Sequence, residues 1–159
     1  MQEMLTSLTL FLAALFAGPS ADVDKPDFIP GSEHVITGQT IAAFGTCAIV
    51  AGDAGRFRLI GSSLRNLQCG DKIVACCRLA IHEHGVTTHT VDSLRILGRE
   101  QVPMPKNVTL AELSNGDHDL SLVRVRGTVD DIATDEVAPD YRIILLKSGN
   151  VALSIPINR

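Results

Sequence analysis

The chain has 159 residues, a hydrophobic content of 45%, a charged content of 20% and a formal net charge of −4. This length accommodates one ordinary domain or two small ones, each with a packed core. The chain has no basic excess, no Trp and a single Tyr. That composition disfavours a protein that grips nucleic acid by its phosphates and stacks bases on aromatic rings.

The first 21 residues contain the longest apolar run of the chain. Residues 5–17 are almost entirely apolar, a length that is typical of a secretory signal peptide and short for a membrane span. Residues 1–4 carry an acid and no Lys or Arg, so an apolar helix that packs on the protein or anchors it in a membrane stays open. We expect a signal peptide or apolar helix over residues 1–21, and an extracytoplasmic chain, periplasmic or secreted.

Residues 22–33 are rich in Asp, Pro and Gly and indicate an extended leader. From residue 34 onward, short strands with alternating apolar side chains are expected. They span residues 34–44, 47–51, 56–60, 72–83 and 86–97. Gly38 marks a bend or bulge in the first strand, and residues 52–55 have the composition of a hairpin turn. A helical turn or loop is expected over residues 62–70.

In the long strand, one row consists of the apolar residues Ile73, Ala75, Cys77, Leu79 and Ile81, which predicts one face on a core. Three strands, an irregular crossing and a hairpin form the strand order of an OB-fold barrel. We therefore predict a mainly β protein with an OB-like barrel over residues 34–98.

A linker with two prolines follows at residues 99–108. Thr109 and Glu112 have the spacing of a capping box, which predicts a single helical turn. A strand over residues 122–132 repeats the opening strand, and a hairpin over residues 141–157 ends the pattern. Residues 109–159 are thus predicted to form an incomplete second OB-like unit. Its open strand edges would favour self-association unless other strands cover them.

The four cysteines are Cys47, Cys69, Cys76 and Cys77. Their spacing contains no C-x-x-C, which argues against a zinc knuckle and a thioredoxin-like redox pair. Cys76 and Cys77 are neighbours on a predicted strand, so one is expected in the core and the other outside. Small buried apolar residues are the favoured interpretation, and a disulfide from Cys47 or Cys69 to one of the pair stays open.

Two segments carry a family resemblance. Leu122-Val-Arg-Val-Arg-Gly-Thr-Val129, preceded by Val108-Thr-Leu-Ala-Glu-Leu113, resembles the OB-type modules in the extracytoplasmic region of bacterial sensor histidine kinases. Gly70-Asp71-Lys72-Ile73-Val74 is similar to the start of a later strand in such barrels. The resemblance covers residues 34–157 and implies a tandem, with the second copy truncated. It implies a sensory input module that binds a small ligand or protein partner, without kinase activity, since no kinase residues are present.

OB folds bind ligands across their second and third strands and the loops beside them. This rule and the placement of arginines give a set of candidate ligand-binding residues: Arg56, Phe57, Arg58, Arg124, Arg126, Tyr141 and Arg142. The alternative for the arginines is a solvated sheet face, and Phe57 and Tyr141 fit a core equally well.

His82, His84 and His89 form the sharpest local cluster. In a hairpin with a two-residue turn at His84 and Gly85, His82 faces Thr87 and the imidazoles reach a common zinc or copper ion. A fourth ligand is not apparent, so solvated histidines at a hairpin tip are the favoured alternative. The acidic loop over residues 130–140 lacks the ligand spacing of a calcium site.

No nucleophile elbow, phosphate loop or zinc-protease motif occurs in the sequence. We therefore expect no enzyme and no cofactor. The leading hypothesis is a non-catalytic exported binding module. The alternatives are an OB fold that binds single-stranded nucleic acid or oligosaccharide, and a small metal-binding protein.

Overall fold

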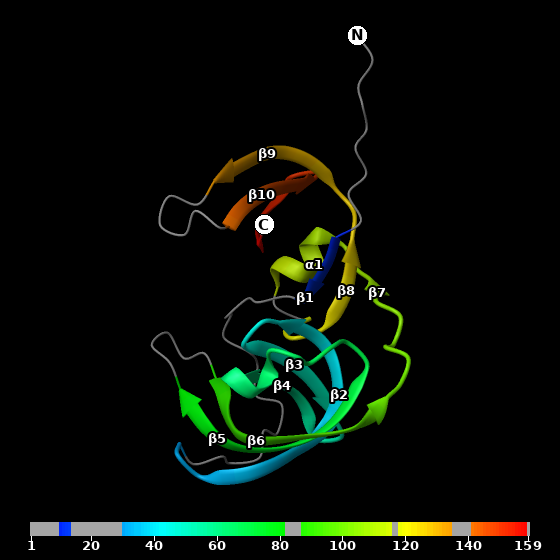
Figure 1. Ribbon diagram of the computed structural model, residues 1–159. Coiled ribbons are helices and arrows are strands. Elements are labelled where there is room, and N and C mark those ends of the chain that lie inside the picture. The colour runs from blue at the N-terminus through cyan, green and yellow to red at the C-terminus, as the bar shows by residue number, and fades with distance from the viewer. Residues whose placement is uncertain (1–9, 14–29, 82–86, 116–117, 135–140, 159) are drawn as a thin grey trace. The chain divides into compact units, whose positions relative to one another are not determined.

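The structure is a computed structural model, mainly β, that separates into two compact units (Figure 1). It describes residues 10–13, 30–81, 87–115, 118–134 and 141–158. The barrel unit consists of Ala13–Met104 and Asp119–Leu122, and the C-terminal unit consists of Met1–Leu12, Pro105–His118 and Val123–Arg159.

Five strands of the barrel unit form a closed barrel in the order β2-β3-β4-β6-β5 (Figure 1). They are β2 (Glu33–Phe44), β3 (Cys47–Gly52), β4 (Gly55–Ile60), β5 (Asp71–Ile81) and β6 (Thr87–Arg99). β4 and β6 pair in parallel through two residue pairs, whereas the other neighbours are antiparallel. A short 3-10 turn, η1 (Ser62–Leu64), connects β4 to β5. The expected small barrel is thus confirmed.

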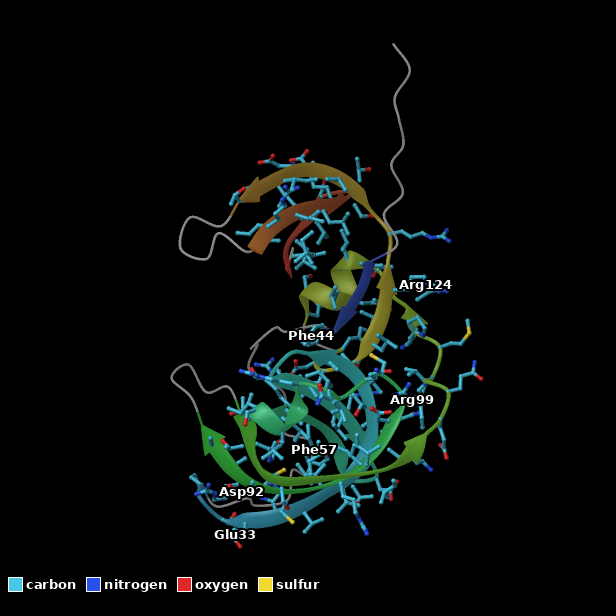
Figure 2. All side chains as sticks on the ribbon, viewed as in Figure 1. Glu33, Phe44, Phe57, Asp92, Arg99 and Arg124 are labelled. Atoms are coloured by element: carbon cyan, nitrogen blue, oxygen red, sulfur yellow. The ribbon has the colours of Figure 1, made fainter. Side chains whose placement is uncertain are left out.

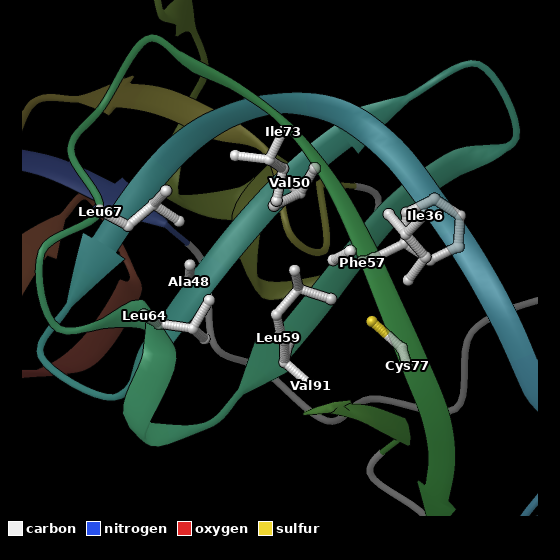
Figure 3. Close-up of a cluster of buried hydrophobic side chains, with 11 residues drawn as sticks. Ile36, Ala48, Val50, Phe57, Leu59, Leu64, Leu67, Ile73, Cys77 and Val91 are labelled. Atoms are coloured by element: carbon white, nitrogen blue, oxygen red, sulfur yellow. The ribbon is translucent and has the colours of Figure 1, made fainter. Parts of the chain in front are cut away.

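The barrel interior is filled by apolar side chains from every strand and from the η1 connection (Figure 3). They are Ile36, Ala48, Val50, Phe57, Leu59, Leu64, Leu67, Ile73, Ala75, Cys77 and Val91. The row predicted from alternation, Ile73 to Leu79, is buried as expected. Each fully buried aliphatic side chain of this size contributes about 1.5–3 kcal/mol.

β2 pairs with two neighbours and coils sharply between them. Its first half pairs with β5, its second half pairs with β3, and the register shifts between Thr40 and Ala42. At the bend, a Cβ on Gly38 would overlap the Ala51 carbonyl and lie 2.8 Å from Val50 Cγ1. A Cβ on Gly52 would lie 2.5 Å from the Thr37 carbonyl oxygen. Glycine is therefore required where these two strands approach each other, which agrees with the bend predicted at Gly38.

The C-terminal unit contains two three-stranded sheets and one helical turn. One sheet has the order β1-β8-β7 and the other the order β11-β10-β9. Their strands are β1 (Leu10–Ala13), β7 (Lys106–Asn107), β8 (Leu122–Val125), β9 (Thr128–Thr134), β10 (Tyr141–Ser148) and β11 (Val151–Asn158). α1 (Leu110–Ser114) has the predicted capping box: the Glu112 N–H donates to Thr109 Oγ1 at 3.1 Å and the Thr109 N–H donates to Glu112 Oε2 at 2.7 Å.

The expected second OB-like unit is not found, because the strand predicted over residues 122–132 is broken. β8 ends at Val125 and β9 starts at Thr128, in a different sheet. Between them, a Cβ on Gly127 would lie 2.7 Å from the Lys147 carbonyl oxygen and 2.8 Å from Leu146 Cγ. This glycine lets the chain pass close to β10 as it changes sheets, and no second barrel forms from the described strands.

The apolar helix expected within residues 1–21 is also not found in the described residues. Leu10–Ala13 form a strand that pairs with β8, and an apolar strand can cover an edge that would otherwise stay open. The remainder of this segment lies outside the described residues. Among the helices that the structure describes, none has both the length and the apolar character needed to cross a membrane.

The outer edges of the β9-β10-β11 sheet carry features that disfavour pairing with a further strand. β9 has a register irregularity opposite Leu145 and Leu146, and Asp130 and Asp131 lie at this point. β11 contains Pro156, which has no N–H to donate. Charges, irregular pairing and proline are the usual means of blunting a sheet edge. The sequence predicts self-association through open strand edges, and this prediction is untested. The charges, the irregular pairing and the proline on these edges disfavour it.

We predict that Gly38→Val destabilises the protein by about 3 kcal/mol or more, because the new side chain must displace the β3 backbone. Thr37→Val is the matched control, since Thr37 is an exposed residue of the same strand. Urea unfolding followed by circular dichroism measures both free energies of unfolding. Equal values for the two variants would contradict the close approach of β2 and β3.

Candidate functional site

The outer surface of β3 and β4 is the first candidate site. Phe57 and Leu59 point into the barrel, so Arg56 and Arg58 lie on the opposite, outward face of β4. Arg56 is opposite Ala51 and Arg58 is opposite Ile49 of β3. Arg56 is exposed and Arg58 is half-buried. The structure therefore places the two predicted arginines of the barrel on one face.

Phe57 is not available on that face. It is 9% exposed and lies inside the barrel (Figure 2), where its ring packs edge-on against His89 with ring centroids 5.3 Å apart. Phe57 is therefore a core residue, which was the alternative to a ligand-binding role. The outer surface of β4 therefore contributes charge and no aromatic ring.

Part of the β3 surface is covered by the protein's own chain. Ile41, Ala42 and Ile49 are buried outside the barrel, with partly buried Ala51, Val102 and Leu120 packed against them. We call these six residues the outer cluster. Because Ile49 is completely buried, the open part of the candidate face lies on the β4 side.

Hydrogen bonds and an ion pair fix the segment that leads into the outer cluster. The Glu100 N–H donates to the Gly70 carbonyl at 2.9 Å, and the Gln39 side chain donates to the Gln101 carbonyl at 3.1 Å. Lys72 Nζ lies 2.6 Å from Glu100 Oε1. The start of the predicted linker is thus bound to the barrel.

Arg58 has a polar atom in an unusual environment. Its Nε is buried and makes no hydrogen bond with the residues that the structure describes. Its positive charge acts on the Cys47 thiol, whose pKa is raised by burial and lowered in part by Arg58. A buried guanidinium N–H without an acceptor is costly, so it needs an explanation.

The predicted residues of the C-terminal unit do not form one cluster. Arg124 is half-buried on β8, and Arg126 is exposed in the connection to β9. Arg142 of β10 pairs with Thr134 at the far end of β9, away from the Arg126 connection. The side chain of Tyr141 lies outside the described residues. The structure therefore separates Arg126 from Arg142 rather than bringing them together.

The histidine hairpin differs from its prediction in register. Thr87 is opposite Ile81 rather than His82, and His89 is opposite Leu79. His89 consequently points into the barrel, where it is 4% exposed. His82 and His84 lie outside the described residues. Within the part of the chain that the structure describes, no group of three or more His, Cys, Asp or Glu side chains is placed to hold a metal ion.

His89 instead contacts a histidine that the sequence did not single out. His34 Nε2 and His89 Nδ1 are 2.7 Å apart, and the ring centroids are 4.8 Å apart. His34 Nδ1 is 3.3 Å from the Ser32 carbonyl oxygen. A carbonyl only accepts, so Nδ1 of a neutral His34 donates to it and Nε2 accepts the Nδ1–H of His89. The pairing of β2 with β5 and of β5 with β6 brings these two histidines together.

The four cysteines are free. Cys77 is buried in the core and Cys76 is exposed, which confirms the prediction that they face opposite ways. Burial is the main cause that raises the pKa of the Cys77 thiol to about 11. Cys77 is therefore a protonated, unreactive core residue at neutral pH.

Comparison of the chain with protein-family models, with curated proteins and with solved structures finds no match. The function must therefore be inferred from the barrel and its side chains.

The buried His89 predicts a stability change in mild acid. Burial, with a smaller contribution from the His34 charge, lowers its pKa from 6.5 to about 4. The unfolded chain binds this proton below pH 6.5 and the folded chain does not until about pH 4, so stability falls as the pH drops through this window. The full effect is about 3 kcal/mol.

Urea unfolding at pH 7.5 and pH 5.5 measures the first part of this loss, because stability held by carboxylates is lost only below about pH 5. His89→Leu should remove most of the difference, whereas His118→Gln, in the C-terminal unit, should retain it. A wild-type protein with the same free energy of unfolding at both pH values would refute the buried neutral state of His89.

Proposed function

We propose that the chain is a non-catalytic binding module built on an OB-type barrel, similar to the sensory input part of a bacterial signalling receptor. One observation carries the proposal. Counted from β2, the closed barrel has the strand order 1-2-3-5-4, with the third and fifth strands parallel and a short turn between the third and fourth. This is the strand order of OB barrels, which bind ligands such as oligonucleotides and oligosaccharides on one face and the loops beside it.

The chemistry of the buried groups supports binding rather than catalysis. The Cys77 thiol is held protonated by burial, and His89 is held neutral. His89 donates its Nδ1–H to another imidazole rather than activating a nucleophile. The groups in the described barrel that resemble catalytic residues thus serve its interior.

The binding surface in this proposal is the β4 side of the outer face, with Arg56 and Arg58. The outer cluster occupies the neighbouring β3 surface. Binding there would be transmitted through packing, since Val102 and Leu120 of the outer cluster pack against residues of both β2 and β3. No bond chemistry is required.

We also propose that the chain is exported, because residues 5–17 form an apolar run of the length found in signal peptides. Expression with fractionation of the host cells, followed by intact mass measurement, tests this. We expect the extracytoplasmic fraction to contain a protein that has lost about twenty residues, as signal-peptide cleavage requires. An intact chain in the cytoplasm would remove the extracytoplasmic part of the proposal.

Binding of single-stranded nucleic acid is the second candidate, favoured by the two arginines of β4. Against it, the outer face of β4 has no aromatic side chain for stacking, because Phe57 is in the core. We expect no change in fluorescence anisotropy when the protein is added to a labelled oligothymidylate of about twelve nucleotides at low salt. Binding that Arg56→Gln and Arg58→Gln both weaken would replace the sensory proposal.

A further inference from the structure

β8 is the middle strand of its sheet, and its two sides are covered by different parts of the chain. On one side it pairs in parallel with β7, which consists of Lys106 and Asn107. On the other side lies β1, the strand Leu10–Ala13 (Figure 1). β1 falls inside the apolar run over residues 5–17, which we propose to be part of a cleaved signal peptide. Cleavage would therefore remove the strand that covers this side of β8.

The hydrogen bonds of β8 identify the backbone groups that face β1. The Val108 N–H donates to the Arg124 carbonyl at 3.0 Å, and Arg124 is opposite Asn107, so Arg124 directs its backbone groups toward β7. Successive residues of a strand direct their N–H and C=O groups to opposite sides. Val123 and Val125 therefore present theirs to the β1 side, and both side chains are completely buried. Without β1, these backbone groups form an open edge that can pair with another strand.

A second copy of the chain is a poor occupant of this edge. If Val123 and Val125 of both copies hydrogen-bond in an antiparallel pair, each Arg124 stands directly opposite its counterpart. Like charges in that position destabilise a sheet. The edges of the β9-β10-β11 sheet are blunted by Asp130, Asp131 and Pro156. The occupant that fits is a strand from a different protein.

β1 itself shows which chemistry this edge accepts. Its sequence, Leu10-Phe-Leu-Ala13, is apolar and uncharged. An extended segment of the same character makes the same main-chain hydrogen bonds and places no cation opposite Arg124. The partner segment is therefore expected to be extended, apolar and free of Lys and Arg.

We propose that the β1 side of β8 is a strand-addition site, which β1 covers in the intact chain and an extended apolar segment of a partner protein fills after export. Main-chain hydrogen bonds to Val123 and Val125 supply the affinity, as in other proteins in which a peptide adds a strand to a sheet edge. The site is separate from the β4 surface. It rests on the export part of the proposed function.

The experiment uses a fluorescein-labelled peptide with the sequence of residues 9–14 and added lysines at its end for solubility. Its anisotropy should rise with a chain that begins at Asp22. Binding to the intact chain should be at least ~10-fold weaker, because the tethered β1 competes at a high effective concentration.

The intact chain with Phe11→Pro and Leu12→Pro is a second variant, which keeps the test decisive if the shortened chain does not fold. Neighbouring N–H groups of a strand point to opposite sides, so one of the two prolines removes a donor that faces β8. This variant should bind the peptide as the shortened chain does. Failure of the peptide to bind either variant would overturn the proposal, as would a shortened chain that dimerises in sedimentation and ignores the peptide.

N-methylation of the peptide provides the matched control. One version is methylated at the positions of Leu10 and Leu12, and the other at those of Phe11 and Ala13. Only one of them loses the donors that face β8, so one should lose binding and the other should keep it. Equal effects of the two versions would indicate nonspecific apolar adhesion and would refute strand addition.

The intact mass of the exported protein separates this inference from the proposed export. A cleaved, exported chain that does not bind the peptide leaves export standing and refutes the strand-addition site. An intact chain in the cytoplasm refutes export and, with it, the opening of this edge.

Discussion

Closure of the barrel around β2 is the constraint on which the other features depend. β2 pairs with β5 through its first half and with β3 through its second half, so the strand must coil within a few residues. Gly38 and Gly52 permit the close approach that this coil requires. Once β2 has turned, the parallel contact of Leu59 with His89 closes the last gap. Every inward and outward row follows from that closure, including the outward position of Arg58 and the inward position of His89.

The barrel was predictable because its strands alternate strictly and their turns are local. The apolar row of β5, the capping box at Thr109 and the opposite faces of Cys76 and Cys77 all follow from spacing of a few residues. The register of β6 was not predictable in this way. The predicted hairpin put His82 opposite Thr87, whereas the structure pairs Ile81 with Thr87, and a shift of one residue moves a whole row to the other face. His89 was therefore expected at a hairpin surface and lies in the core.

In the C-terminal unit, local sequence pattern also failed to predict the structure at one glycine. Within its own segment, Gly127 resembles Gly38, and both follow a run of alternating residues. Gly38 bends a strand that continues, whereas Gly127 ends one strand and starts another against Lys147 and Leu146. The difference depends on contacts twenty residues along the chain, which local periodicity does not encode. The outer cluster is similar, because Val102 and Leu120 lie in segments without a regular pattern.

Charges on the barrel are used in two ways: some cations pair with a carboxylate and others have no ion pair with the described residues. The chain has 18 acidic residues and 14 Lys and Arg residues, so acids are not scarce. One acidic residue of the barrel, Asp71, is almost fully buried and accepts hydrogen bonds from Arg99 and from the Gln68 N–H. The Arg99 hydrogen bond is the largest cause of the lowered pKa of Asp71. Arg56, Arg58 and Arg95 of the barrel have no ion pair with the described residues, whereas Lys72, Arg78 and Arg99 each have one. Because the Nε of Arg58 is shielded from water, an external anion cannot reach this atom in the described structure, and Arg56 is the more exposed of the two charges.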